Sequence, residues 1–308
     1  MSHSPRSKSG VVEIPELDLA MTLNSGQVFH WTALDQGWIG CIGDTPVFLR
    51  QQGDKLEFRG IEEMALRHYL ALDHDLEAIR ASCAHPVVRE ASLGCRGLRI
   101  LRQPLWECLA TFILSPMKQV AHIRQMSLAL RGRFGPALFG SPVPGFPSAS
   151  ALSAATEQEL RACGLGFRAK GLLGTARLVA SGEFDPEALT TLSTAEARDA
   201  LCTLPGIGRK VANCILLFAY ERLEVVPVDV WIGRILGSFR SRRKSTPAEL
   251  ERYGEQVLGP YAGYVQQWLF HRARTGLLEL PAKKSPRHKA TARTAPPSRR
   301  RIPRSVTG

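Results

Sequence analysis

The chain has 308 residues, of which 44% are hydrophobic and 22% are charged. This length and composition fit one large folded domain or two smaller ones, and they exclude a chain that is disordered throughout. The formal net charge of +12 points to a polyanionic partner, with nucleic acid first and an anionic membrane second.

The positive charge lies mainly at the two ends of the chain. Residues 281–308 carry nine Lys or Arg and no acid, residues 1–10 carry two, and residues 11–280 have a net charge of +1. We expect a disordered basic end at 1–10 and a disordered basic tail at 281–308. The tail is interpreted as an arm that adds salt-sensitive DNA affinity, with a localisation signal or a membrane-facing segment as alternatives.

The cysteines and the start of the chain bear on the compartment. None of the seven cysteines has CxxC spacing and their number is odd, which argues against a zinc ribbon and a secreted disulfide framework. The first residues contain no apolar segment, and the longest apolar stretch, near 211–220, is too short to span a bilayer. We expect an intracellular protein without membrane attachment, and the Arg-, Ala-, Leu- and Gly-rich composition favours a bacterial cytoplasm or nucleoid over a nucleus.

The N-terminal part reads as a small antiparallel sheet. Residues 38–42, 46–51 and 55–59 mix β-branched and aromatic residues, and Gly-Asp dipeptides at 43–44 and 53–54 separate them as tight hairpins require. Residues 61–72 turn helical. We predict an N-terminal antiparallel β-sheet domain with helices over residues 11–95.

The pattern from residue 105 to 277 is helical. Leu105, Cys108, Leu109, Phe112 and Ile113 have the spacing of one buried helix face. Further helices are predicted at 118–133, 148–154, 157–163, 167–181, 193–202, 209–220, 230–238, 247–257 and 261–275. The fold class is therefore α+β, with an all-helical domain over residues 96–280 after the sheet domain.

A glycine-containing turn joins two of these helices. Leu204-Pro205-Gly206-Ile207-Gly208 lies between apolar helices, and backbone amides at the start of the second helix can bind a phosphate without side-chain charge. A Cβ on either glycine would hinder close approach of the phosphate. A plain helix–helix turn with a glycine cap is the alternative.

Two polar residues near this turn can carry chemistry. Lys210 lies in the first turn of the second helix, where the helix dipole disfavours a further positive charge and so favours a neutral, nucleophilic amine. Asp229, nineteen residues later, is placed to N-cap the helix that begins at Val230. A solvated surface lysine and a purely structural cap are the alternative interpretations.

The hairpin, Lys210 and Asp229 together resemble the helix-hairpin-helix, Gly-Pro-Asp superfamily of DNA glycosylases, and in particular the 8-oxoguanine DNA glycosylases. The resemblance spans about residues 15 to 277. It implies that Lys210 is the nucleophile, that Asp229 assists, and that the enzyme also cleaves the strand as an AP lyase. The backbone around Gly206, Gly208 and Val211 would then bind DNA.

The resemblance also implies a pocket for the damaged base. Ser25-Gly26-Gln27-Val28-Phe29-His30-Trp31 is similar to the segment whose glycine carbonyl accepts a hydrogen bond from N7–H of 8-oxoguanine. Gln266 and Phe270, four residues apart on one helix face, would read and stack on the flipped base, and Cys214 would pack on its other face. By pattern alone, a half-buried helix is the favoured interpretation of Gln266 and Phe270.

Further family features concern the DNA around the lesion. Gly164-Leu165-Gly166-Phe167-Arg168-Ala169 is similar to a segment in which Phe167 would wedge into the base stack and Arg168 would contact the orphaned cytosine. Three asparagines and an arginine of the animal and fungal members are replaced by Met117, Lys118, Gln119 and His122. Their loss predicts weaker discrimination among opposite bases. Trp231 replaces a histidine, which puts a phosphate contact there in doubt.

The resemblance implies base excision repair of 8-oxoguanine in duplex DNA through a Lys Schiff base, by a monomer without metal or cofactor. Related members place four cysteines after the aspartate to hold an iron–sulfur cluster, but no cysteine follows Cys214. The alternatives are a glycosylase for an alkylated purine or an oxidised pyrimidine, and a non-catalytic helix-hairpin-helix DNA-binding protein. The sequence leaves open the opposite-base preference, the balance of excision and strand cleavage, and the source organism.

Overall fold

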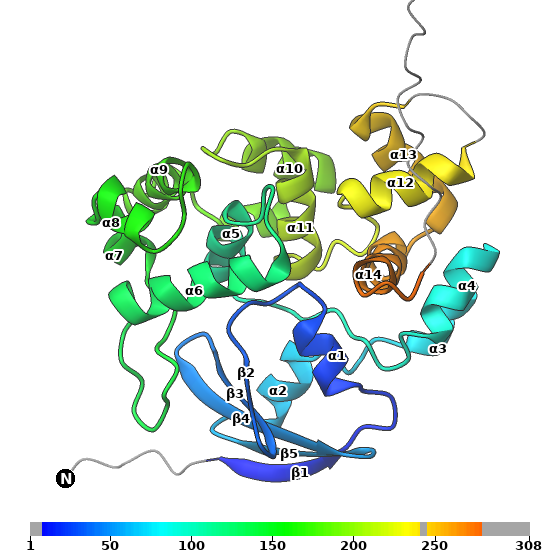
Figure 1. Ribbon diagram of the computed structural model, residues 1–308, viewed down its shortest axis with the longest axis horizontal. Coiled ribbons are helices and arrows are strands. Elements are labelled where there is room, and N and C mark those ends of the chain that lie inside the picture. Colours follow the sequence, from blue (N-terminus) through cyan, green and yellow to red (C-terminus); the bar gives the residue numbers. More distant parts are fainter. Residues whose placement is uncertain (1–7, 241–244, 279–308) are drawn as a thin grey trace, which may run out of the picture.

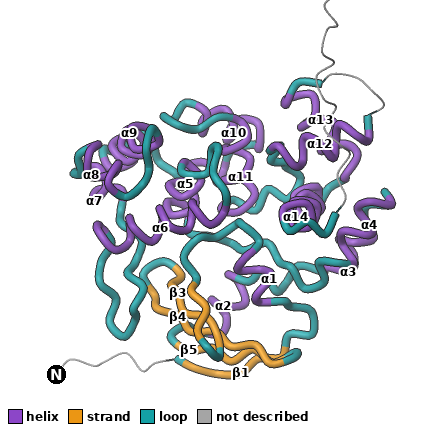
Figure 2. Tube along the Cα trace, in the orientation of Figure 1, coloured by secondary structure: helices purple, strands orange, loops and turns teal. Residues whose placement is uncertain are grey.

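The computed structural model describes residues 8–240 and 245–278, in which a small sheet lies beside a larger group of helices (Figures 1 and 2). The strands are β1 (Ser9–Glu13), β2 (Thr32–Leu34), β3 (Gly37–Ile42), β4 (Thr45–Gln52) and β5 (Lys55–Arg59). The predicted α+β class is confirmed. The predicted basic tail at 281–308 lies outside the described residues.

The sheet is antiparallel throughout, with strand order β1-β5-β4-β3-β2. The predicted hairpins β3–β4 and β4–β5 are present, and Gly43 and Gly53 both adopt φ +58 in their turns. The strand β1 was not predicted, and β2 was not named as a separate strand. The assignment of residues 1–10 to a disordered end is wrong at Ser9 and Gly10, because their backbone pairs with Arg59 and Phe58 of β5.

The predicted helices occur within a few residues of their expected ends. They are α2 (Glu63–Tyr69), α5 (Leu105–Ile113), α6 (Val120–Phe134), α7 (Ala149–Ser153), α8 (Glu157–Ala162), α9 (Arg168–Ala180), α10 (Thr194–Cys202), α11 (Arg209–Ala219), α12 (Val230–Phe239), α13 (Pro247–Leu258) and α14 (Ala262–Arg274). The helices α1 (Leu19–Asn24), α3 (Leu76–Ala81) and α4 (Pro86–Leu93) and a 3-10 turn (Glu187–Thr191) were not predicted. None of the helices in residues 8–240 and 245–278 combines the length and apolarity needed to cross a membrane.

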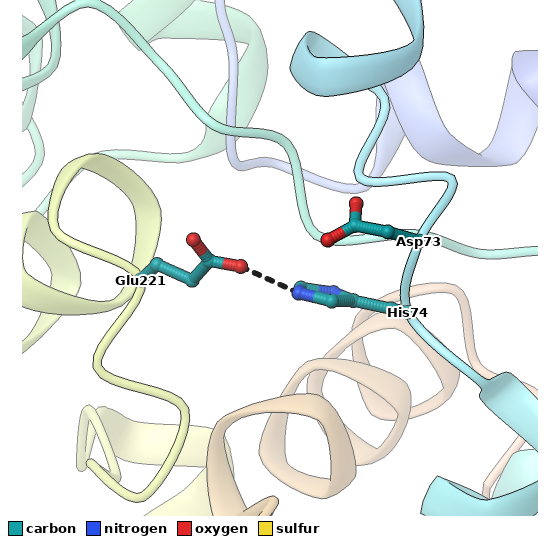
Figure 3. A group of neighbouring side chains, drawn as sticks. All are labelled: Asp73, His74 and Glu221. Carbon is teal, nitrogen blue, oxygen red and sulfur yellow. Dashed lines mark hydrogen bonds and ion pairs between the residues drawn. The ribbon is translucent and has the colours of Figure 1, made fainter.

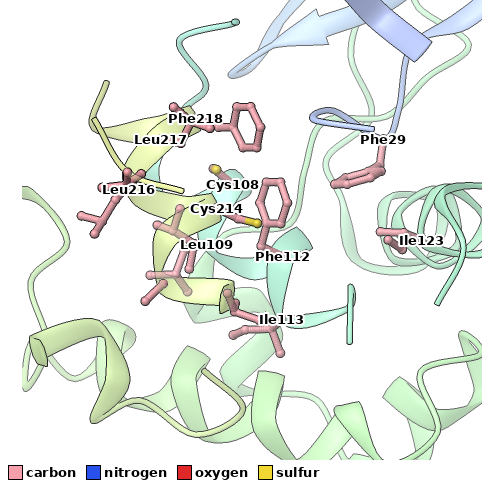
Figure 4. Packing of buried hydrophobic residues seen from close by; sticks show 14 of the residues in the cluster. Phe29, Cys108, Leu109, Phe112, Ile113, Ile123, Cys214, Leu216, Leu217 and Phe218 are labelled. Atoms are coloured by element: carbon pink, nitrogen blue, oxygen red, sulfur yellow. The ribbon is translucent and has the colours of Figure 1, made fainter. Parts of the chain in front are cut away.

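Two hydrophobic clusters fill the interior. One lies under the sheet and includes Trp31, Leu49 and Leu56. The other fills the helical part, and it also takes in Phe29 and the buried residues of α3 and α4 (Figure 4). The chain between residues 11 and 95 therefore contributes to both clusters, and the domain boundary at residue 95 stays a prediction.

A buried polar group fixes the sheet to the helices. Arg131 of α6 is fully buried and forms an ion pair with Glu107 of α5. Its other guanidinium nitrogen lies 2.9 Å from the thiol sulfur of Cys41 in β3. The ring of His30 lies 3.0 Å from the same carboxylate and 2.7 Å from the Cys41 carbonyl oxygen. Burial by itself would raise the pKa of Glu107, but Arg131 and His30 hold it at about 2.

We predict that Arg131→Met lowers the free energy of unfolding by about 3–5 kcal/mol, because it leaves the buried Glu107 carboxylate without its partner. Arg133→Met on the same helix is the matched control. Its exposed ion pair with Glu159 is 3.1 Å long, and its loss should cost less than about 1 kcal/mol. Urea unfolding of both variants measures the difference. Equal losses would show that the buried pair contributes no more than a surface pair.

Candidate active site

The turn between α10 and α11 has the shape that its glycines predicted. Gly206 adopts φ +86, and a Cβ there would lie 3.3 Å from both Gly171 of α9 and Ile113 of α5. Gly208 is the N-cap of α11, and a Cβ on it would meet no protein atom within 4 Å. The hairpin is thus packed against its neighbours at Gly206 and open at Gly208, where a phosphate could approach the first amides of α11.

Lys210 occupies the first turn of α11 and reaches into a cavity rather than into bulk solvent. The cavity has a volume of about 1030 Å³, and its lining includes Lys210 and Asp229. The ammonium nitrogen lies 3.3 Å from the hydroxyl oxygen of Ser115 and 5.8 Å from the centre of the Phe112 ring. The half-buried amine therefore lies beside the Ser115 hydroxyl group and the Phe112 ring.

Asp229 caps α12 as predicted. Its side chain accepts a hydrogen bond of 2.8 Å from the backbone N–H of Ile232. Burial raises the pKa of this carboxyl group, and the opposing effects come from the Ile232 N–H and from the positive charge of Lys210. The carboxylate is therefore held rigidly by the helix end, partly removed from water, and electrostatically coupled to the amine.

The lining of the cavity also includes residues from distant parts of the chain. Gly26 adopts φ +90, and a Cβ there would lie 2.9 Å from Val120 of α6 and 3.2 Å from the Phe270 ring of α14. Only glycine fits this close approach without displacing a neighbour. Gly26, Phe270, Lys210 and Asp229, predicted from three separate segments, are thus brought around one cavity.

Two predicted pocket residues lie behind this surface. Gln266 is 4% exposed, and its side-chain oxygen is buried without a hydrogen-bond partner among the described residues. Cys214 belongs to the buried cluster drawn in Figure 4, and burial raises the pKa of its thiol. Neither belongs to the cavity lining in the described structure, so their contact with a base stays a prediction. An unpartnered buried amide oxygen is what a site awaiting a hydrogen-bond donor would contain.

The predicted wedge lies at a second, smaller hollow of about 260 Å³ beside the hairpin. Phe167 is 61% exposed, as a side chain that enters a base stack should be. Arg168 instead points inward and donates hydrogen bonds to the Pro116 carbonyl oxygen, while its guanidinium carbon lies 4.3 Å from the centre of the Phe167 ring. Contact of Arg168 with a cytosine would require these internal bonds to be exchanged.

The segment before α6 carries the remaining predicted contacts. Met117 is 91% exposed and adopts φ +57, an uncommon conformation for a residue with a side chain, and it lines the cavity. Lys118 and Gln119 line it as well, whereas His122 is exposed on α6 and outside it. Val211 lines the cavity at the start of α11.

Several cavity residues were missed by the sequence reasoning. Ser115 approaches Lys210, and Arg274 of α14 lines the cavity with its guanidinium carbon 6.0 Å from the centre of the Phe270 ring. Arg274 lies four residues after Phe270, so helical spacing could have placed it on the same face. The position of Ser115 depends on the packing of α5 against α11, which a local pattern does not contain.

The carboxylates of Asp73 and Glu221 and the ring of His74 lie close enough together to resemble a metal site (Figure 3). Arg102 already provides a positive charge there, with its nitrogens 2.6 and 2.7 Å from the Asp73 oxygens and a further ion pair to Glu221. His74 also contacts the Tyr264 hydroxyl at 2.8 Å. We interpret this group as a polar link between the segment after α2 and α14.

A hollow of about 1190 Å³ also lies beside the sheet and is lined by Glu16, Trp38 and Arg80 among others. It contains neither Lys210 nor Asp229, and the Glu16 and Arg80 side chains pair with each other across it. We therefore place the candidate active site in the cavity at α11.

Comparison with known proteins shows the family of the chain. Residues 11–109 match the family described as 8-oxoguanine DNA glycosylase, N-terminal domain, and residues 111–260 match the HhH-GPD superfamily of base excision DNA repair proteins. The N-glycosylase/DNA lyase OGG1 of Arabidopsis thaliana is 34% identical, over 88% of this chain and 79% of its own length.

Two solved structures share the fold over most of their length. MBOgg1, solved with a low-affinity DNA ligand, is 31% identical with a TM-score of 0.82, over 89% of this chain and 98% of its own. The Clostridium acetobutylicum 8-oxoguanine glycosylase/lyase, solved with double-stranded DNA containing cytosine opposite 8-oxoG, is 25% identical with a TM-score of 0.80, over 87% and 98% of the two chains. This chain therefore belongs to the 8-oxoguanine DNA glycosylase family within the HhH-GPD superfamily.

Proposed function

We propose that this protein excises 8-oxoguanine from duplex DNA and then cleaves the strand at the resulting site. The observation that carries the proposal is the arrangement of one cavity. The amine-bearing Lys210, the carboxylate-bearing Asp229, Gly26 and Phe270 all line it. A base extruded into this space would have its edge at the glycine backbone and its sugar at the amine.

The chemistry follows from the order of these groups. The neutral amine of Lys210 attacks C1′ of the deoxyribose and the bond from C1′ to the base breaks. The base leaves with the bonding electrons and takes up the proton that the attacking nitrogen gives up. The Asp229 carboxylate stabilises the positive charge that develops on the sugar. Opening of the sugar gives an imine to Lys210, and loss of a 2′ proton then expels the 3′ phosphate. None of these steps calls on a group beyond the side chains and the DNA.

The surroundings support binding of DNA beside the cavity. There is open space around Gly208 at the start of α11, and the exposed Phe167 lines the smaller hollow together with Pro205 and Gly206 of the hairpin. We propose that the protein acts as a monomer, in the compartment that holds the cell's DNA, with a bacterial cytoplasm or nucleoid favoured over a nucleus. No metal or organic cofactor is part of the proposal.

The first prediction concerns the nucleophile. Borohydride should trap the protein covalently on a duplex with one 8-oxoguanine opposite cytosine, because reduction fixes the imine to Lys210. Lys210→Gln should still bind this duplex but form no adduct and lose both excision and strand cleavage. Free base released without any adduct would indicate a water-dependent glycosylase, and full excision by the variant would remove Lys210 from the mechanism. Activity on another lesion alone would favour the alkylpurine or pyrimidine alternative.

The second prediction concerns Asp229. Asn also caps helices well, so Asp229→Asn should keep α12 while it removes the negative charge. We expect single-turnover excision to fall by about 100- to 1000-fold, the cost of removing one electrostatic stabiliser. A near-native melting temperature would show that the cap survives, and excision within a few-fold of the wild-type rate would limit Asp229 to capping.

The same carboxylate predicts a pH dependence. Burial raises the pKa of Asp229, so the carboxylate becomes protonated at a higher pH than an ordinary aspartate as the solution is acidified. Wild-type excision should therefore lose rate on the acid side at a pH above the usual aspartate value of 3.8. Rate profiles of the wild type and Asp229→Asn measure this, and the part of the acid-side loss that comes from protonation of Asp229 should be absent from the variant.

A further prediction concerns the base opposite the lesion. The exposed Met117 and the exposed His122 offer fewer hydrogen bonds to cytosine than asparagine and arginine would. We expect excision opposite adenine to be slower than opposite cytosine by less than about a hundredfold. Single-turnover rates on the two duplexes test this, and a larger ratio would mean that other residues read the cytosine.

A further inference from the structure

The backbone on either side of Gly26 is held by buried amide side chains. Gln267 of α14 donates a hydrogen bond of 3.1 Å to the carbonyl oxygen of Ser25. Gln103 donates one of 2.7 Å to the carbonyl oxygen of Gln27. Both glutamines are buried. The two carbonyls that flank Gly26 are therefore occupied, each by a residue far away in the sequence.

The side chain of Gln27 fixes the same segment from within. Its amide oxygen accepts a hydrogen bond of 2.8 Å from the backbone N–H of Leu101. Its amide nitrogen donates a hydrogen bond of 2.8 Å to the Arg99 carbonyl oxygen. The same nitrogen lies 2.9 Å from the Ser25 hydroxyl oxygen. Gln27 is fully buried, so these bonds are shielded from competition with water.

The carbonyl of Gly26 differs from its neighbours. In residues 8–240 and 245–278, the carbonyl oxygens of Ser25 and Gln27 each accept a hydrogen bond. The carbonyl oxygen of Gly26 accepts none from these residues. Glycine at φ +90 has no side chain to restrict its rotation, so its orientation must come from the bonds on either side.

We propose that Gln267 and Gln103 are positioning residues that hold the Gly26 carbonyl in the orientation that separates 8-oxoguanine from guanine. The inference rests on the proposed function, in which this carbonyl faces N7 of the flipped base. 8-Oxoguanine presents N7–H as a donor, whereas guanine presents a lone pair that a carbonyl repels. A carbonyl that is free to turn away would lose the attraction and escape the repulsion, so fixed orientation is what makes one contact selective.

The placement of Gln267 strengthens this assignment. It adjoins Gln266 on α14, and Phe270 follows three residues later with its ring against Gly26. One helix therefore supplies the ring beside the glycine, the unpartnered buried amide of Gln266 and the bond that orients the glycine. A shift of α14 would move all three groups together.

Gln267→Met and Gln103→Met test the proposal, because methionine keeps the length of the side chain and removes the donor. We expect each to slow single-turnover excision of 8-oxoguanine opposite cytosine about five- to tenfold, the value of one well-placed hydrogen bond. Cleavage at a preformed abasic site should be unchanged, since no base remains to be read. That second activity also shows that the variant is folded.

A binding measurement separates orientation from general damage. In the Lys210→Gln background, the ratio of dissociation constants for a guanine duplex and an 8-oxoguanine duplex should fall by about the same factor in each variant. Tyr69→Phe is the matched control, because it removes another buried hydrogen bond, the 3.0 Å contact from Trp31, away from the cavity. The excision rate of Tyr69→Phe should match that of the wild type. In the Lys210→Gln background, its ratio of dissociation constants should match that of Lys210→Gln alone.

The outcomes separate the positioning role of Gln267 and Gln103 from the proposed function. Excision and abasic-site cleavage that fall together, or an unchanged binding ratio, would overturn the positioning role while the proposed function stands. A wild-type protein that leaves 8-oxoguanine in place would overturn both. Slower excision with intact abasic-site cleavage and a reduced ratio would establish the role.

Discussion

The cavity can work only if the sheet and the helices keep a fixed relative position. Gly26 comes from the N-terminal part, Lys210 from α11 and Phe270 from α14, and they meet across a space of about 1030 Å³. Covalent attack requires the amine to lie at a defined distance from the sugar, and small displacements of the base or the amine are costly. The structure meets this constraint with buried polar contacts between the halves, whose directionality fixes orientation where apolar packing alone would allow sliding.

These contacts lie on both sides of the segment that contains Gly26. Gln267 and Gln103 hold its backbone, and four residues downstream His30 enters the buried group formed with Glu107 and Arg131. The segment therefore has little freedom to move independently of the helices. Such groups are expensive to bury, and their presence is better explained by the need for one geometry than by a gain in stability.

Electrostatics at the site is local. Residues 11–280 carry a net charge of only +1, so a broad positive field is not what brings the phosphates to the cavity. The open amides at Gly208 and the amine of Lys210 concentrate positive potential at one helix end. The same helix end therefore suits both binding of a phosphate and presentation of a nucleophile.

Much of this arrangement could be predicted from sequence, and the failures have physical reasons. Strands of β-branched residues between Gly-Asp turns, and helices with a clear apolar face, carry their own signal, and Asp229 was placed correctly as a cap. The start of strand β1 gave no signal because Ser9 and Gly10 have no strand preference, and pairing with β5 imposes their conformation. The inward position of Arg168 depends on the Pro116 carbonyl, which no local pattern places beside it.

Gly26 shows why a sequence motif does not contain all the residues on which a binding site depends. A glycine is needed at residue 26 because Val120 and Phe270 leave no room for a Cβ. The lack of a side chain at this glycine also leaves its peptide group free to rotate. A freely rotating carbonyl would accept a hydrogen bond from N7–H and turn away from an N7 lone pair with equal ease. Selectivity at such a position has to be supplied by neighbours that occupy the adjacent carbonyls. Residues such as Gln267 therefore belong to the recognition chemistry although they touch no base, and only the folded structure reveals them.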